Sequence, residues 1–283
     1  MKRRIVICAL GLIGFASSAT GAGSIPPEPR SPSADAGLSL AGRFAEVARD
    51  LLGLPYHNGP LGEGAFGGPD PDPRVDWERV DCVTYLEQCL ARALTPLDAS
   101  LLPVLDAIRY RAGVVGFAER NHFMVTDWLP ANSWLVRDVT AQSAPGKTLR
   151  IRRTIDRAEF LRGHGVTPSP ADAPREATIA VIPRRDAAKA EGRLRTGDLV
   201  FWVGDREGIF SLHTGLVARG LSGELLFRHA SSRAGQVVDD SFRDYAASAE
   251  YAVGFLVLRP RADARVPLSA QPSPADGSSG GNP

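Results

Sequence analysis

The spacing of apolar residues changes about halfway along this 283-residue chain, and the change constrains the fold more than any other feature. In the first half, apolar residues recur every three or four positions, which predicts helices over about 39–53, 81–95 and 100–113. The second half has short apolar runs between glycine-containing turns, which predict strands. The strongest of these runs are 199–203, 213–218, 225–229 and 251–258. Helices followed by an antiparallel sheet indicate an α+β fold.

The first 24 residues have the composition of a signal peptide. Three positively charged positions, 2–4, precede an uncharged apolar stretch over 5–16, and small residues follow. A helix of that length is too short to span a bilayer core of ~30 Å. We therefore expect an exported protein, periplasmic or extracellular, with residues 1–24 removed and with no membrane span.

The remaining chain divides by composition into three parts. Residues 25–38 are rich in Pro, Ser and Ala and predict a linker, whereas residues 263–283 lack apolar periodicity and predict a disordered tail. The segment 39–262 between them has the length of one domain, which we expect to act as a monomer. The net charge is only +1 and the arginines are scattered among acids, so we expect no nucleic-acid partner.

Two cysteines of the mature chain fall in one predicted helix. Cys82 and Cys89 are seven positions apart, a helical rise of ~10.5 Å, whereas a disulfide needs Cα atoms within ~7 Å. Unpaired thiols in an oxidising compartment need an explanation. Cys82 directly follows the potential cap Asp81, and the start of a helix favours a thiolate, so we expect Cys82 to be a nucleophile. Cys89, in mid-helix on the apolar stripe, is expected to be a core residue.

Two histidines are expected to meet on one face of a hairpin. If the chain turns about Leu221, His213 lies directly opposite His229. One imidazole could then take the proton of the Cys82 thiol while the other fixes its tautomer. A zinc site made of Cys82, His213 and His229 is the competing interpretation. Because the chain lacks the close-spaced ligand pair typical of zinc proteins, we expect neither a metal nor a cofactor.

Five short motifs resemble, in order, those of the NlpC-type cell-wall hydrolases. They are LGLPY at 52–56, DCVTY at 81–85, TGDLV at 196–200, HTGLV at 213–217 and HASS at 229–232. The resemblance implies a papain-like fold, with N-terminal helices, the nucleophile at a helix start, and an antiparallel sheet packed against them. It also implies hydrolysis of amide bonds in peptidoglycan.

Further motifs resemble one branch of these proteins. They are the Val-Thr that follows Cys82, RYRAG at 109–113, RNHF at 120–123 and the pair at 127–128. These are similar to the N-acetylmuramoyl-L-alanine amidase-like branch, long known only as a domain of unknown function. The resemblance implies cleavage between the lactyl group of the sugar and L-alanine in soluble anhydro-muropeptides, the expected peptidoglycan-fragment partners.

Five more residues are candidates for substrate contact. By resemblance, the hydroxyl of Tyr56 helps to shape the oxyanion site beside the cysteine. Arg120, His122, Asp127 and Trp128 combine an aromatic ring with planar polar groups, which suits a sugar. The arginine could equally be solvated, and the tryptophan could be a core residue.

Three functions remain open from the sequence. The leading interpretation is an amidase that acts on the N-acetylmuramoyl-L-alanine bond through a thioester on Cys82. The second is a γ-D-glutamyl-diamino acid endopeptidase, and the third is an inactive wall-binding homologue. A binder has no need of Cys82, His213 and His229 together, which favours an enzyme.

Overall fold

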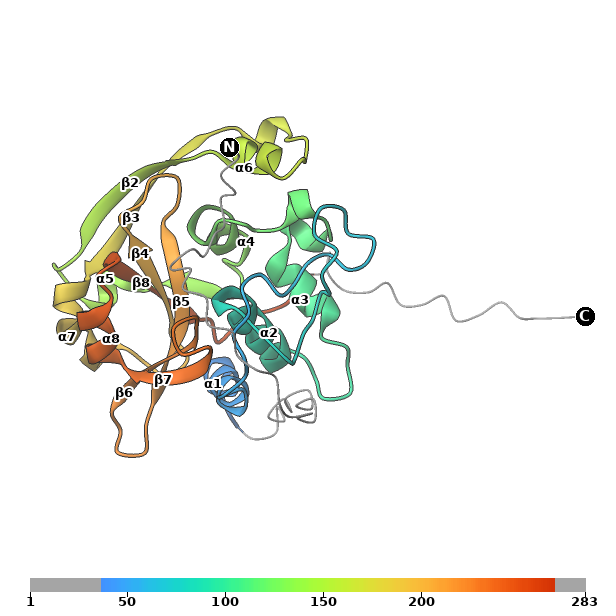
Figure 1. Cartoon of the computed structure of the whole chain (residues 1–283). Helices are drawn as coiled ribbons and strands as arrows, with labels where there is room; N and C mark the ends of the chain where they lie inside the picture. Colours follow the sequence, from blue (N-terminus) through green and yellow to red (C-terminus); the bar gives the residue numbers. More distant parts are fainter. Residues whose placement is uncertain (1–36, 268–283) are drawn as a thin grey trace, which may run out of the picture.

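A computed structural model describes residues 37–267 of the chain. The expected signal peptide and most of the expected linker and tail lie outside the described residues. A group of helices lies on one side of a curved sheet, and shorter helices lie against the opposite face (Figure 1). The fold is therefore α+β with an antiparallel sheet, as the sequence predicts.

The helical side forms where the sequence spacing predicts it. It contains α1 (Leu40–Asp50), α2 (Cys82–Leu94), α3 (Leu102–Arg109) and the short α4 (Leu129–Ala131). The hydroxyl oxygen of Ser39 caps α1 by accepting a hydrogen bond from the amide of Gly42. Within the described residues, no helix is long and apolar enough to cross a membrane.

The sheet has eight strands, and every pairing in it is antiparallel. The strands are β1 (Val136–Asp138), β2 (Leu149–Ile155), β3 (Arg175–Pro183), β4 (Leu199–Gly204), β5 (Ser211–Arg219), β6 (Leu225–Ser231), β7 (Gln236–Ser241) and β8 (Ala252–Pro260). Their order is β2-β3-β8-β4-β5-β6-β7, with β1 paired to β8. The hairpin of β2 and β3 extends away from the rest, and α6 (Arg157–Gly163) lies at its end (Figure 1).

The central strand β4 separates two hydrophobic cores, because successive side chains of a strand point to opposite faces. Leu199, Phe201 and Val203 belong to the core shared with the long helices. Val200 and Trp202 belong to the second core. The short helices α7 (Ala187–Ala190) and α8 (Phe242–Ser248) contribute to this second core, as do the residues on either side of α5 (Thr140–Ser143), Val139 and Ala144.

The hairpin of β5 and β6 differs in register from the sequence prediction. Arg219 pairs with Leu225, so the turn is centred on Ser222 and not on Leu221. The pairing with β6 also stops at Leu216, so His213 is not directly opposite His229. Moving the turn by one residue shifts the pairing by two, and a shift of two keeps every side chain on its original face. Both histidines therefore remain on the same face.

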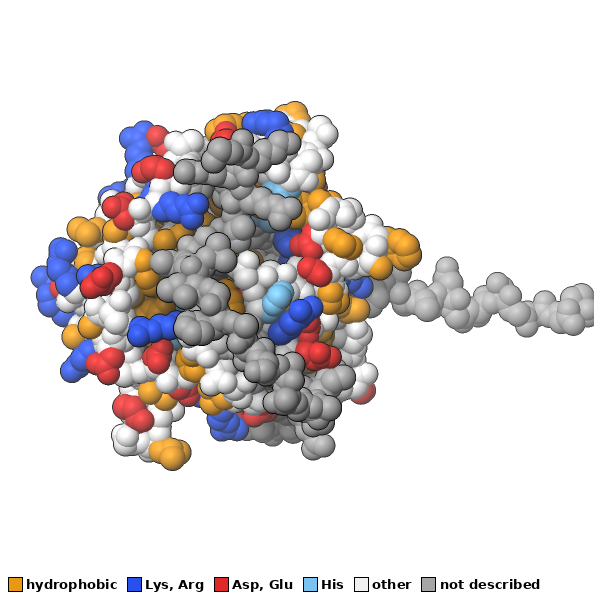
Figure 2. All heavy atoms as spheres, viewed as in Figure 1, with side chains coloured by type: hydrophobic (Ala, Val, Ile, Leu, Met, Phe, Trp, Pro, Cys, Tyr) orange, Lys and Arg blue, Asp and Glu red, His pale blue; other side chains and the backbone are white. Residues whose placement is uncertain are grey.

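The molecular surface carries both signs of charge. On the face shown in Figure 2, basic and acidic side chains are interspersed, in line with the net charge of +1.

Candidate active site

The start of α2 positions Cys82. The carboxylate of Asp81 accepts hydrogen bonds from the amides of Val83 and Thr84 at 3.0 and 2.8 Å, and the hydroxyl oxygen of Thr84 accepts one from the amide of Asp81 at 2.9 Å. This capping box places Cys82 in the first turn, at the positive end of the helix dipole, where negative charge is stabilised. The hydroxyl of Thr214 on β5 donates to the carbonyl of Cys82 at 2.9 Å and so ties the helix start to the sheet.

Cys89 has the surroundings of a core residue. It is completely buried, and this burial raises the pKa of its thiol well above the usual value. Cys82 and Cys89 form no disulfide. The protonated, enclosed Cys89 thiol is unsuited to nucleophilic attack.

A chain of three side chains leads away from the pocket through the histidine pair. Nε2 of His213 lies 2.7 Å from Nδ1 of His229, and Nε2 of His229 lies 3.0 Å from Oδ2 of Asp240 on β7. The hydrogen bond from His229 lowers the pKa of Asp240, which is therefore ionised at neutral pH. An ionised carboxylate can only accept, so His229 carries its proton on Nε2 and offers the lone pair of Nδ1. His213 must then donate from Nε2, which leaves its Nδ1 to exchange a proton with another group.

Aromatic rings hold the two imidazoles in place. The ring of Phe227 stacks on His229 at 4.6 Å between centroids, and the ring of Tyr245 on α8 lies 5.0 Å from His229 and 6.1 Å from His213. A Cβ atom at Gly215 would lie 2.5 Å from the Phe227 ring, so β5 and β6 can pair at this spacing only with glycine at that position. Burial raises the pKa of Tyr245, whose hydroxyl bonds to Tyr251 at 2.8 Å and remains protonated.

One pocket brings the candidate nucleophile and base together with a polar wall. Cys82 at the start of α2 and His213 on β5 both line it. The polar wall comes from the end of α3 and the segment that follows it, and it consists of Arg109, Arg120, Asn121 and His122. Of the residues selected from the sequence, the pocket therefore gathers Cys82, His213, Arg120 and His122. His229 lies behind His213.

Arg120 and His122 are anchored at the pocket by contacts of their own. The guanidinium of Arg120 donates to Glu63 at 2.7 Å and to Asp70 at 2.8 Å, and so braces the loop that carries both carboxylates. Nε2 of His122 lies 2.7 Å from the carbonyl oxygen of Phe117. Burial and the nearby charge of Arg120 lower the pKa of His122 well below its usual value, which keeps its ring neutral.

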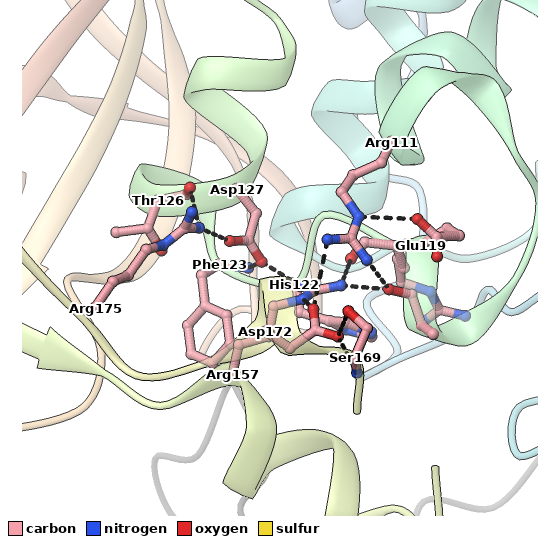
Figure 3. Close-up of polar contacts among 12 residues, drawn as sticks. Arg111, Glu119, His122, Phe123, Thr126, Asp127, Arg157, Ser169, Asp172 and Arg175 are labelled. Atoms are coloured by element: carbon pink, nitrogen blue, oxygen red, sulfur yellow. Dashed lines mark hydrogen bonds and ion pairs between the residues drawn. The ribbon is translucent and has the colours of Figure 1, made fainter. Parts of the chain in front are cut away.

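Asp127, a candidate for substrate contact, lies between two arginines. Its buried carboxylate forms ion pairs with Arg157 and Arg175, and Arg157 also donates to Asp172 at 2.8 Å (Figure 3). Asp127 lies in the π-helix η4 (Met124–Trp128) and does not line the pocket. Its position gives it the role of a structural anchor between η4, α6 and β3.

Trp128 and Tyr56 also lie outside the pocket lining. The Trp128 side chain is fully buried in the main core, and its Nε1 donates to Glu87 at 3.2 Å, so it supports the site from behind. Tyr56 is half-buried. Its backbone forms an isolated β-bridge with Val80, beside the segment that leads into Cys82. Trp128 is therefore a core residue, which was one of the two interpretations that the sequence allowed.

Within residues 37–267, no three or more His, Cys, Asp and Glu side chains are grouped so as to hold a metal ion.

An α+β fold with a thiol and an imidazole in one pocket is typical of hydrolases that form covalent intermediates. The model of the N-acetylmuramoyl-L-alanine amidase-like (AmiA-like) family matches residues 46–254, and the chain belongs to this family. The matched range includes Cys82, Cys89, the histidine pair and Asp240.

Solved structures of two other proteins share the fold. A protein from Legionella pneumophila has a TM-score of 0.70 and 22% identity, over 80% of this chain and 90% of that one. An N-acetylmuramoyl-L-alanine amidase from Bacteroides uniformis has a TM-score of 0.64 and 23% identity, over 78% of this chain and 99% of that one. No curated protein matches the sequence.

Proposed function

We propose that this protein is an exported peptidoglycan amidase that hydrolyses the N-acetylmuramoyl-L-alanine bond of soluble muropeptides. One observation carries the proposal: Cys82 and His213 line a single pocket, and His213 is backed by His229 and Asp240. Family membership and the name of the Bacteroides uniformis relative support the choice of bond. The five NlpC-type motifs add a papain-like mechanism to the proposal.

In this mechanism, Nδ1 of His213 takes the proton of the Cys82 thiol. The thiolate attacks the lactyl carbonyl carbon, and the C–N bond to L-alanine breaks as the imidazolium returns the proton to the leaving amine. Water then attacks the thioester, His213 takes a proton from it, and the Cys82 thiol is released with the sugar carboxylic acid. Throughout, Nδ1 of His229 accepts the hydrogen bond from the Nε2–H of His213 and so stabilises the imidazolium.

Digestion of a purified muropeptide tests the proposed bond. We expect the enzyme to release the intact stem peptide and a disaccharide that bears a free lactyl carboxyl group, with little action on the sugar-free tetrapeptide. Mass spectrometry of the products identifies the bond. Cleavage of the sugar-free tetrapeptide at the same rate as the muropeptide would instead identify a γ-D-glutamyl-diamino acid endopeptidase. Tight binding without any product would identify a wall-binding protein.

A further inference from the structure

The strand that carries His213 has an irregularity directly before this residue. Trp202 on β4 pairs with His213. The next residue of β4, Val203, pairs with Ser211, which leaves Leu212 as an extra residue on β5. Such a β-bulge bends the strand and changes the direction of the side chains beside it. Ser211, Leu212 and His213 all line the pocket, so the bulge is part of the pocket wall.

The loop that leads from β4 into the bulge has little packing of its own. Residues 205–208 are exposed, Ile209 is half-buried, and Phe210 reaches the main core. The amide of Gly204 donates to the carbonyl of Phe210 at 3.1 Å and closes the base of the loop. Because an exposed segment of this kind buries little apolar surface, contacts with other elements decide how well it is ordered.

Arg153 on β2 supplies such a contact, at the point where the β2–β3 hairpin passes beside the loop (Figure 1). The side chain is 4% exposed, and its guanidinium donates to the carbonyls of Gly204 at 2.7 Å, Arg206 at 2.6 Å and Ile209. The guanidinium also lies over the ring of Phe210, 5.5 Å from its centroid. One planar group therefore holds carbonyls from the start, the middle and the end of the loop.

The contact depends on the shape of the guanidinium as well as on its charge. The carboxylate of Asp205 lies 3.8 Å from Arg153, but the Asp205 side chain is 90% exposed, so solvent screens this ion pair. The three carbonyls are therefore the stronger partners. A guanidinium presents its donors in a fixed fork, whereas the ammonium of lysine is a compact group on a flexible stem. Replacing Arg153 by lysine should therefore loosen the loop while keeping the charge.

We propose that Arg153 is a positioning residue that acts on His213 through the β4–β5 loop. By holding the loop, Arg153 fixes the bulge at Leu212 and with it the position of the His213 ring relative to Cys82. The inference rests on the proposed function, because it takes His213 as the base that serves Cys82. Arg153 does not line the pocket, so its effect reaches the site only through the backbone.

The reactivity of the Cys82 thiol tests this role without any substrate. Iodoacetamide reacts with the thiolate, so the pH profile of Cys82 alkylation, followed by mass spectrometry, reports how well His213 takes the thiol proton. His213→Ala gives the profile of a thiol without its base. We expect Arg153→Lys to move the profile to higher pH, toward that of His213→Ala, and to lower the rate at neutral pH about 10-fold.

Arg92→Lys is the matched control, because Arg92 is also a buried arginine that holds carbonyl groups. It is 3% exposed, donates to the carbonyls of Thr95 at 3.0 Å and Pro96 at 2.6 Å, and does not line the pocket. We expect Arg92→Lys to lower stability and to keep the alkylation profile of the unmodified protein. If Arg153→Lys does not fold, Arg153→Gln takes its place, since it retains planar N–H donors without a buried charge. Identical profiles for the folded Arg153 variant and the unmodified protein would overturn the proposal.

Muropeptide kinetics on the same variants separate this role from the proposed function. Because Arg153 touches no substrate, its replacement should lower kcat and change KM less than twofold. A shifted alkylation profile in a protein that cleaves no muropeptide would support the positioning role, and the proposed function alone would fail. An unshifted profile in an active amidase would overturn the positioning role and leave the proposed function intact.

Discussion

Asp240 is a residue whose role follows from a single hydrogen bond. It accepts from His229 and so decides which nitrogen of each imidazole carries a proton. Removing its carboxylate takes away a negative charge that favours the imidazolium, so the basic limb of the pH–rate profile should move to lower pH. For Asp240→Ala we expect this shift and a kcat lower by about 10-fold, less than for a fully buried carboxylate because water reaches this one.

Asp239→Ala is the matched control for that variant. The neighbouring carboxylate of Asp239, also on β7, pairs with Arg228 on β6 at 2.7 Å, and its side chain points to the opposite face of the sheet from Asp240. We expect the Asp239→Ala substitution to lower the stability of the fold and to leave the pH–rate profile unchanged. Identical profiles for the Asp240→Ala variant and the unmodified enzyme would contradict the role given to Asp240.

Sequence reasoning at the scale of single residues succeeded where the pattern was local. The cap at Asp81 and the core position of Cys89 follow from helix spacing alone. Asp240 could not be predicted, because its contact depends on the pairing of β7 with β6, and the charged strand has no clear apolar alternation. The arginine partners of Asp127 could not be predicted either, because they lie 30 and 48 positions away in the sequence.

At the scale of elements, the contact between α2 and β5 determines how Cys82, the proposed nucleophile, lies relative to His213, the proposed base. The Thr214 hydroxyl makes this contact by donating to the carbonyl of Cys82, and Thr214 is almost fully buried. Thr214→Val keeps the shape of the side chain but loses the donor. We expect a stability loss of about 1 kcal/mol and a lower kcat, because the helix start is free to shift.

Thr214→Ser restores the hydroxyl and should recover most of the kcat that Thr214→Val loses. Urea unfolding and steady-state kinetics on the two variants measure these effects. If valine and serine give the same kcat, the hydrogen bond has no part in positioning Cys82.

The hairpin of β5 and β6 shows how much of a strand register can be predicted from sequence. The face shared by His213 and His229 was predicted correctly, although the turn is centred one residue later than expected. The prediction survived because side chains alternate with a period of two, so only an odd shift in pairing would have separated the histidines. The residues of the turn, 220–224, include two glycines and do not fix its centre.

At the scale of the whole molecule, the buried Arg157 and the exposed Arg175 connect α6 and the β2–β3 hairpin to the helical side. Asp127 is the shared partner of Arg157 and Arg175 in this network (Figure 3). Asp127→Ala removes one of the two carboxylate partners of the buried Arg157, which keeps its ion pair with Asp172, so we expect a stability loss of about 1–3 kcal/mol. Since Asp127 lies outside the pocket, KM of the folded protein should change less than twofold, as kinetics well below the unfolding temperature can measure. A large rise in KM without loss of stability would return Asp127 to the substrate site.

The overall architecture was accessible from sequence because helices and strands occupy separate halves of the chain. The α+β class and the antiparallel sheet are confirmed. The strand order was not predictable, because β8 lies between β3 and β4 and joins segments far apart in the chain. The division into a signal peptide, a linker, one domain over 39–262 and a tail stays a prediction.

The central claim, that Cys82 is the nucleophile, is tested most directly by comparing the turnover of two single-cysteine variants. Both substitutions remove one thiol from α2, but only Cys82 lines the pocket with His213. We expect Cys82→Ala to lose muropeptide hydrolysis by a factor of about 10³ or more while remaining folded. Cys89→Ala should lose about 1 kcal/mol of stability and keep its kcat. Turnover by a folded Cys82→Ala variant at the rate of the unmodified enzyme would contradict the account.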